Sequence, residues 1–193
     1  MDVVTVLQGQ AARTSTLVDS VPPDHLGLPT PCSDWTVRDL INHLCLVAQF
    51  CARVASGEQV EPDYETDFVG DDPSGAYRRW QKEMLEACTA PGLAERTVYM
   101  MGQEFPGAVV LALALMDTVV HRSDLSRAIG VDPEIDPGVA ALVLEQVRPF
   151  IPDEMRAPAP DETTGTIPFG PVVEVPDDAP PLDRLLAFLG RTP

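Results

Sequence analysis

Basic residues are scarce in this sequence. It has 13 Lys and Arg against 30 Asp and Glu, which gives a formal net charge of −17 at pH 7. A surface of this charge repels phosphate backbones and anionic lipid headgroups at long range. We therefore expect neither a nucleic acid nor a membrane surface among the partners.

Cysteines and long apolar runs are also few. The four cysteines, Cys32, Cys45, Cys51 and Cys88, form no Cys-x-x-Cys pair and are too sparse for a disulfide framework in 193 residues. The longest aliphatic stretch, 108–116, is about half of the roughly 20 residues that cross a bilayer. No basic segment precedes an apolar one at the N-terminus, as in a signal peptide. These absences predict a cytoplasmic protein with free thiols.

Helical periodicity, by contrast, covers most of the chain. Thr36 and Asp39 match a capping box and predict the start of one helix. Residues 56–74 are acidic and rich in turn residues, which predicts a crossover loop. Apolar residues three and four apart predict helices over about 4–18, from 36, over 77–88, 106–129, 138–148 and 182–189.

Two segments interrupt this helical pattern. Residues 96–105 hold β-branched and aromatic side chains around Gly102, which predicts a short extended hairpin. Residues 152–181 are rich in proline and acid, and within them 166–175 suggest a peripheral strand. We therefore expect a mainly α fold, in which residues 1–150 form an antiparallel four-helix bundle. Residues 151–193 would form a C-terminal extension that packs on the bundle and ends in a short helix.

One set of polar residues falls on helix faces that are otherwise apolar. Asp117 and His121 are four residues apart on the longest predicted helix, so they share a face. His43 lies on the apolar stripe of the helix that starts at Thr36. A buried carboxylate is costly unless it is paired or bound to metal, and two imidazoles with one carboxylate form a ligand set with open positions. The alternative is a hydrogen-bonded Asp117–His121 pair, with His43 an ordinary core histidine.

Three stretches of the sequence resemble a known family. They are Leu28-Pro-Thr-Pro-Cys-Ser-Asp-Trp-Thr-Val-Arg-Asp-Leu-Ile-Asn-His43-Leu, Met116-Asp-Thr-Val-Val-His-Arg-Ser-Asp-Leu-Ser-Arg-Ala-Ile-Gly130 and the ending Asp183-Arg-Leu-Leu-Ala-Phe-Leu-Gly-Arg-Thr-Pro193. The first two resemble the N-terminal domain of mycothiol-dependent maleylpyruvate isomerase, of the DinB-like superfamily. The ending resembles a small uncharacterised actinobacterial-type subgroup.

This resemblance implies a divalent metal ion bound by His43, Asp117 and His121. Zinc is the first expectation, with nickel and iron as alternatives. The sequence departs from the family in having Asp117 where the isomerase has Glu, which leaves the metal identity open. It also has Ser123 where relatives often carry tryptophan, and we interpret this as a change in packing rather than a larger pocket.

The neighbours of these residues are interpreted more simply. Trp35 is expected to anchor its loop and Asp39 to cap the helix. Asp124 and Arg127 follow the face of His121, where either could orient a ligand or meet a substrate carboxylate, or the two could form an ion pair. Cys45 and Cys51 are assigned no catalytic role.

The function implied by the resemblance is enzymatic. A cation beside a low-molecular-weight thiol such as mycothiol favours the thiolate. The resemblance therefore implies a metal- and thiol-dependent transferase or isomerase that acts on a small electrophile. A non-catalytic metal-binding sensor or partner-binding protein and a metal-dependent hydrolase stay open, as does a homodimer. The substrate is not fixed by any feature of the sequence.

Overall fold

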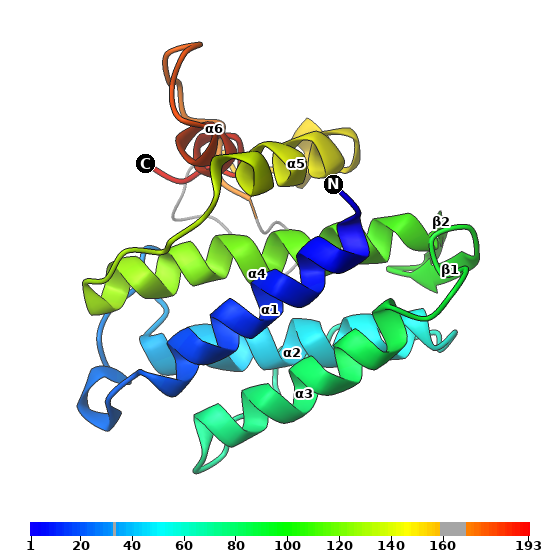
Figure 1. Cartoon of the computed structure of the whole chain (residues 1–193), viewed down its shortest axis with the longest axis horizontal. Coiled ribbons are helices and arrows are strands. Elements are labelled where there is room, and N and C mark those ends of the chain that lie inside the picture. Colours follow the sequence, from blue (N-terminus) through cyan, green and yellow to red (C-terminus); the bar gives the residue numbers. More distant parts are fainter. Residues whose placement is uncertain (33, 159–168) are drawn as a thin grey trace.

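Helices dominate the architecture of the protein, for which a computed structural model describes residues 1–32, 34–158 and 169–193. The described residues form six α-helices and one two-stranded antiparallel hairpin (Figure 1). These elements are α1 Val3–Asp19, α2 Val37–Ala55, α3 Pro73–Cys88, β1 Thr97–Met100, β2 Gln103–Pro106, α4 Gly107–Ile129, α5 Pro137–Val147 and α6 Pro181–Phe188. The expected mainly α fold with a short hairpin is confirmed. None of the described helices is long and apolar enough to span a membrane.

Local sequence signals fix the ends of the two helices that matter most for function. At α2, the Thr36 side chain accepts a hydrogen bond from the backbone N–H of Asp39, and the Asp39 carboxylate accepts one from the backbone N–H of Thr36. This is the predicted capping box. Helix α4 ends at Gly130, which has a left-handed φ of 75° that suits glycine. The sequence predicted that Pro106 is the first residue of this helix. In the structure Pro106 is instead the N-cap of α4.

The four long helices pack side by side, with α1 and α2 each against both α3 and α4 (Figure 1). The loop after α2 runs back along that helix, because the Asn42 side chain donates to the Thr66 carbonyl and accepts from the Phe68 N–H. Helix α3 therefore starts beside the first turns of α2 and runs in the same direction as α2 (Figure 1). Helix α4 runs opposite to α2. The sequence predicted an antiparallel four-helix bundle, and the parallel direction of α2 and α3 is a difference from that expectation.

Burial is most complete along α4. Nearly every residue from Val109 to Ser126 is buried, and Leu113 is half-buried. When a helix is buried on all sides, its polar side chains lose their contacts with water, which costs free energy unless they are hydrogen-bonded. The polar residues of α4 must therefore find partners inside the protein.

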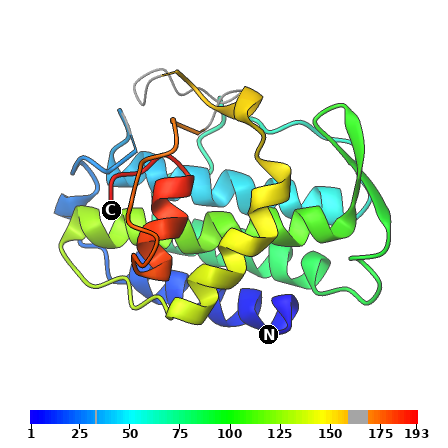
Figure 2. The ribbon, with the colours of Figure 1, turned by 90° about the horizontal axis from the view of Figure 1, so that it is seen from above.

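The C-terminal elements cover one side of α4. Helix α5 packs on α4, and α6 packs on α5 (Figures 1 and 2). Of the strand suggested for 166–175, residues 166–168 lie outside the described residues, and Phe169 forms a single bridge with Arg156. After α6 the chain turns back toward α4, where Arg127 donates to the Thr192 carbonyl at 2.8 Å.

Candidate metal centre

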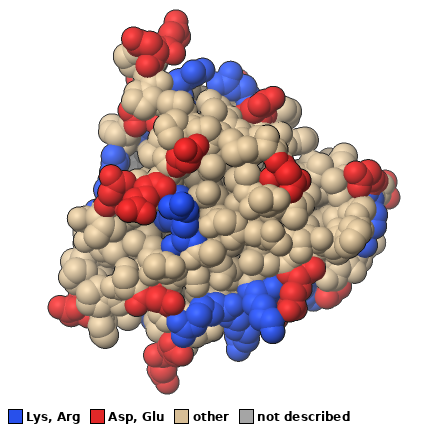
Figure 3. All heavy atoms as spheres, in the orientation of Figure 1, with Lys and Arg blue, Asp and Glu red and all other residues tan. Residues whose placement is uncertain are grey.

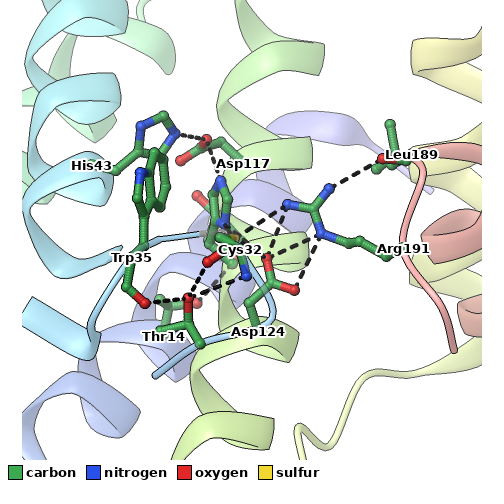
Figure 4. Close-up of polar contacts among 11 residues, drawn as sticks. Thr14, Cys32, Trp35, His43, Asp117, Asp124, Leu189 and Arg191 are labelled. Carbon is green, nitrogen blue, oxygen red and sulfur yellow. Dashed lines mark hydrogen bonds and ion pairs between the residues drawn. The ribbon is translucent and has the colours of Figure 1, made fainter. Parts of the chain in front are cut away.

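Helices α2 and α4 bring the three predicted ligands together. His43 Nε2 lies 3.0 Å from Asp117 Oδ1, and His121 Nε2 lies 3.4 Å from the same oxygen (Figure 4). The three ligand atoms lie within 4.8 Å of one another. Ligands of a tetrahedral zinc ion lie about 3.3 Å apart, given bond lengths near 2.0 Å. His43 is therefore no isolated core histidine, and the spacing suits one ion, although the same contacts also satisfy the metal-free protein as hydrogen bonds.

The centre lies near the surface at the side of His43. The side chain of Asp117 is 7% exposed, whereas that of His43 is 18% exposed. The centroids of the Trp35 and His43 rings lie 4.7 Å apart. The backbone carbonyl of Trp35 accepts a hydrogen bond from the Thr30 hydroxyl. Trp35 thus anchors its loop, as expected, and also forms a wall of the centre. Partial burial and the negative charge of Asp117 raise the pKa of Tyr64, on the loop between α2 and α3.

Burial and charge set the protonation of the centre in opposite ways. Burial alone would raise the pKa of Asp117, but His121 and His43 outweigh it and hold that pKa well below its ordinary value. Burial would lower the pKa of His121, but Asp117 and then Asp124 raise it well above its ordinary value. For His43, burial outweighs Asp117 and lowers the pKa. Without metal, the centre therefore holds an ionised Asp117 and a protonated His121, whose Nε2 proton a metal ion would displace.

A second carboxylate fixes the other nitrogen of His121. Asp124 Oδ2 lies 2.9 Å from His121 Nδ1 (Figure 4). Burial would raise the pKa of Asp124, but Arg191 and His121 hold it well below its ordinary range. Because Asp124 is ionised, it accepts the hydrogen bond and Nδ1 carries the hydrogen. This is the carboxylate–histidine arrangement that orients many metal-bound imidazoles.

A second group of ligating atoms overlaps the first. Cys32, His121 and Asp124 also have ligand atoms within 4.8 Å of one another. Arg191 already occupies this group, however, with Nη2 3.0 Å from Asp124 Oδ2 and 3.9 Å from Cys32 Sγ. A fixed guanidinium neutralises the acidic ligand and repels a second cation. The group of His43, Asp117 and His121 is therefore the better candidate.

Asp124 and Arg127, which neighbour the centre on α4, have different partners from each other. In the described part of the chain, the ion pairs of Asp124 are with His121 and Arg191, so the simple Asp124–Arg127 pair does not form. Arg127 instead contacts the carbonyl of Thr192. Ser123 is buried on α4.

Cys32 and Arg191 are neighbours of the centre that the sequence patterns did not predict. Cys32 lies inside the recognised motif, but the motif gives no indication that its thiol faces α4. Arg191 follows Gly190, and a glycine after a helix signals a turn without giving its direction. The remaining cysteines are buried, as expected of residues without a catalytic role, and burial raises the pKa of Cys45 to about 12.

Comparisons with known proteins cover the whole chain. Residues 7–126 match a family described as the mycothiol maleylpyruvate isomerase N-terminal domain. Two proteins described as uncharacterised, from Mycobacterium tuberculosis strains H37Rv and CDC 1551, are each 32% identical over 192 residues. Those alignments cover 100% of this chain and 99% of each relative. No solved structure matches the chain.

Proposed function

This chain belongs to the mycothiol maleylpyruvate isomerase N-terminal domain family, and from that premise we propose that it is a metal- and thiol-dependent transferase or isomerase. His43, Asp117 and His121 would hold one divalent ion, with zinc the first candidate and nickel or iron the alternatives. The thiol would be mycothiol or a related low-molecular-weight thiol, and the second substrate a small electrophile. The same proposal treats α1–α4 as a DinB-like four-helix bundle, with residues 151–193 as its extension.

The observation that supports this proposal best is that the two ring nitrogens of His121 have different partners. Nδ1 is committed to Asp124, so Nε2 faces Asp117 and His43. Three protein ligands leave at least one coordination position open, which is typical of catalytic rather than structural sites. When bound there, a divalent ion would stabilise a thiolate at neutral pH.

The surrounding side chains prepare the centre for that chemistry. Among the described residues, the ion-pair partners of Asp117 are two imidazoles and not a fixed cation, so its charge is available to an exchangeable ion. The Trp35 ring covers the histidine rings from one side and limits water there. Because Asp117 is one methylene shorter than the glutamate of the isomerase, the choice among zinc, nickel and iron stays open.

A turnover experiment separates the proposed function from its alternatives. Protein loaded with zinc is incubated with maleylpyruvate or an aryl halide, with mycothiol, with cysteine or without thiol. We expect consumption that requires both metal and thiol and is lost in His43→Ala, while Arg127→Gln behaves as wild type. Hydrolysis products formed without thiol would instead identify a hydrolase. A metal-loaded protein that consumes neither compound would contradict the proposal in favour of a non-catalytic metal-binding protein.

A further inference from the structure

We infer that Arg191, at the C-terminal end of the chain, is a positioning residue of the metal centre that acts on His121 through Asp124. The inference rests on the proposed metal site. Arg191 lies beyond the residues 7–126 that match the family, and it belongs to none of the motifs that carry the predicted ligands. A continuous series of contacts runs from Arg191, just after α6, through Asp124 to the imidazole of His121.

The first contact joins Arg191 to Asp124. Arg191 Nε lies 3.1 Å and Nη2 3.0 Å from Asp124 Oδ2, and Nε also lies 3.2 Å from Oδ1 (Figure 4). The Asp124 side chain is only 4% exposed. A two-point contact of this kind fixes the plane of the carboxylate as well as its charge. Asp124 is therefore held in the one orientation in which Oδ2 also accepts from His121 Nδ1.

The backbone after α6 delivers Arg191 to this position. Gly190 has a left-handed φ of 82°, and a Cβ there would lie 2.8 Å from the backbone of Gly170. The Arg191 N–H then donates to the Leu186 carbonyl at 2.9 Å, which closes the end of the helix. Arg156 holds the same corner by donating to the Phe188 carbonyl at 2.8 Å. The turn is thus specified by glycine and secured from a second segment.

Without Arg191, two things should change at once. Asp124 would be a buried carboxylate with His121 as its remaining charged partner, so it could turn away and release the imidazole. The group of Cys32, His121 and Asp124 would also lose the guanidinium that now occupies it. Arg191 therefore sets the direction of His121 Nε2 and keeps a metal ion out of the cysteine-containing group.

The test is a zinc-affinity series in the full-length protein, measured by competition with a chromophoric chelator. The variants are Arg191→Gln, Arg191→Lys, Asp124→Asn and the double variant Asp124→Asn/Arg191→Gln. Arg127→Gln is the matched control, because Arg127 contacts the same terminal segment but not Asp124. Loss of an outer partner of this kind weakens metal binding by roughly 10- to 100-fold. We expect that loss in Arg191→Gln and Asp124→Asn, a smaller loss in Arg191→Lys, and wild-type affinity in Arg127→Gln.

The double variant tests whether Arg191 acts through Asp124. If it does, the double variant binds zinc about as weakly as Asp124→Asn alone, because the effects of coupled residues are not additive. Losses that multiply, or an Arg191→Gln variant with wild-type affinity, would overturn the inference. If wild type itself binds no zinc, or if His43→Ala keeps full affinity, the proposed metal site fails instead, so the two failures are distinguishable.

Cobalt(II) provides an independent spectroscopic readout in the absence of added thiol. In wild type the ion should show no thiolate-to-cobalt charge-transfer band in the near ultraviolet. In Arg191→Gln we expect this band to appear, and to vanish again in Cys32→Ser/Arg191→Gln. A thiolate band already present in wild type, or no band in Arg191→Gln, would contradict the role of Arg191 in excluding the ion from Cys32. All variants are compared with wild type by far-ultraviolet circular dichroism, which a positioning role leaves unchanged.

Discussion

At the scale of single residues, the two buried aspartates of α4 differ because their partners differ. In the part of the chain that the structure describes, Asp124 has a permanent cation in Arg191, whereas the ion-pair partners of Asp117 are the two imidazoles. The carboxylate without a fixed cation is the one that can accept an exchangeable metal ion. His121 lies between the two aspartates and links the fixed charge to the exchangeable one.

The four thiols should differ sharply in reactivity in the native protein. Burial raises the pKa of Cys45 and of Cys88 to about 12 and that of Cys51 above its ordinary value, so all three stay protonated near pH 8. Alkylation requires the thiolate, so the half-buried Cys32 should be the one labelled by iodoacetamide. Peptide mass spectrometry after digestion measures this, with urea-denatured protein as the control in which all four react. Equal labelling of Cys51 and Cys32 would contradict the burial described for α2.

At the scale of elements, local signals predicted what local interactions determine. The capping box at Thr36, the hairpin around Gly102 and the end of α4 at Gly130 depend on residues close in sequence, and the structure contains all three. Helical spacing also placed His43 on the apolar face of α2, and Asp117 and His121 on one face of α4. These three candidate ligands could therefore be predicted from the sequence. The direction of α3 and the path of the chain after Gly190 depend on contacts between distant segments. Arg191 and the thiol of Cys32 could not be placed for the same reason.

The capping box that starts α2 should be measurable by itself. In Thr36→Ala, the Asp39 N–H loses its side-chain acceptor, and loss of such a cap lowers the free energy of unfolding by about 1 kcal/mol. Urea unfolding of the zinc-free protein measures the change. Thr16→Ala is the control, because its hydroxyl bonds a carbonyl inside α1 and caps no helix end. An unchanged unfolding midpoint for Thr36→Ala would show that the cap adds nothing to stability.

At the scale of the whole molecule, the charged side chains are unevenly distributed over the surface. Acidic side chains are spread over the visible face, and basic ones form their largest group along its lower edge, where α3 lies, with smaller groups elsewhere on the face (Figure 3). With a net charge of −17, we continue to predict that the protein does not bind nucleic acid.

The packing of α6 on α5 and of α5 on α4 connects the C-terminus to the helix that carries Asp117 and His121. We therefore expect residues 151–193 to unfold together with residues 1–150.

This cooperativity can be tested through α6. Leu185 is fully buried, and Leu185→Ala should lower the free energy of unfolding by about 3 kcal/mol through lost burial and a cavity. Trp35 and Trp80 fluorescence reports the region of α2 and α3, whereas circular dichroism reports all helices. Both signals should shift to the same lower urea concentration. Leu182→Ala, at a half-buried position, should shift them less. Separate transitions for the two signals would show that α6 unfolds independently.

The most direct test of the account is the metal content of single-ligand variants. Wild type, His43→Ala, His121→Ala, Cys32→Ala and His25→Ala are purified without chelator and analysed by plasma mass spectrometry. His121 belongs to both ligand groups, whereas His43 and Cys32 each belong to one, and His25 belongs to neither. We predict one divalent ion per chain in wild type, Cys32→Ala and His25→Ala, and substoichiometric metal in His43→Ala and His121→Ala. Full metal content in His43→Ala, or its loss in Cys32→Ala, would contradict the assignment of the ion to His43, Asp117 and His121.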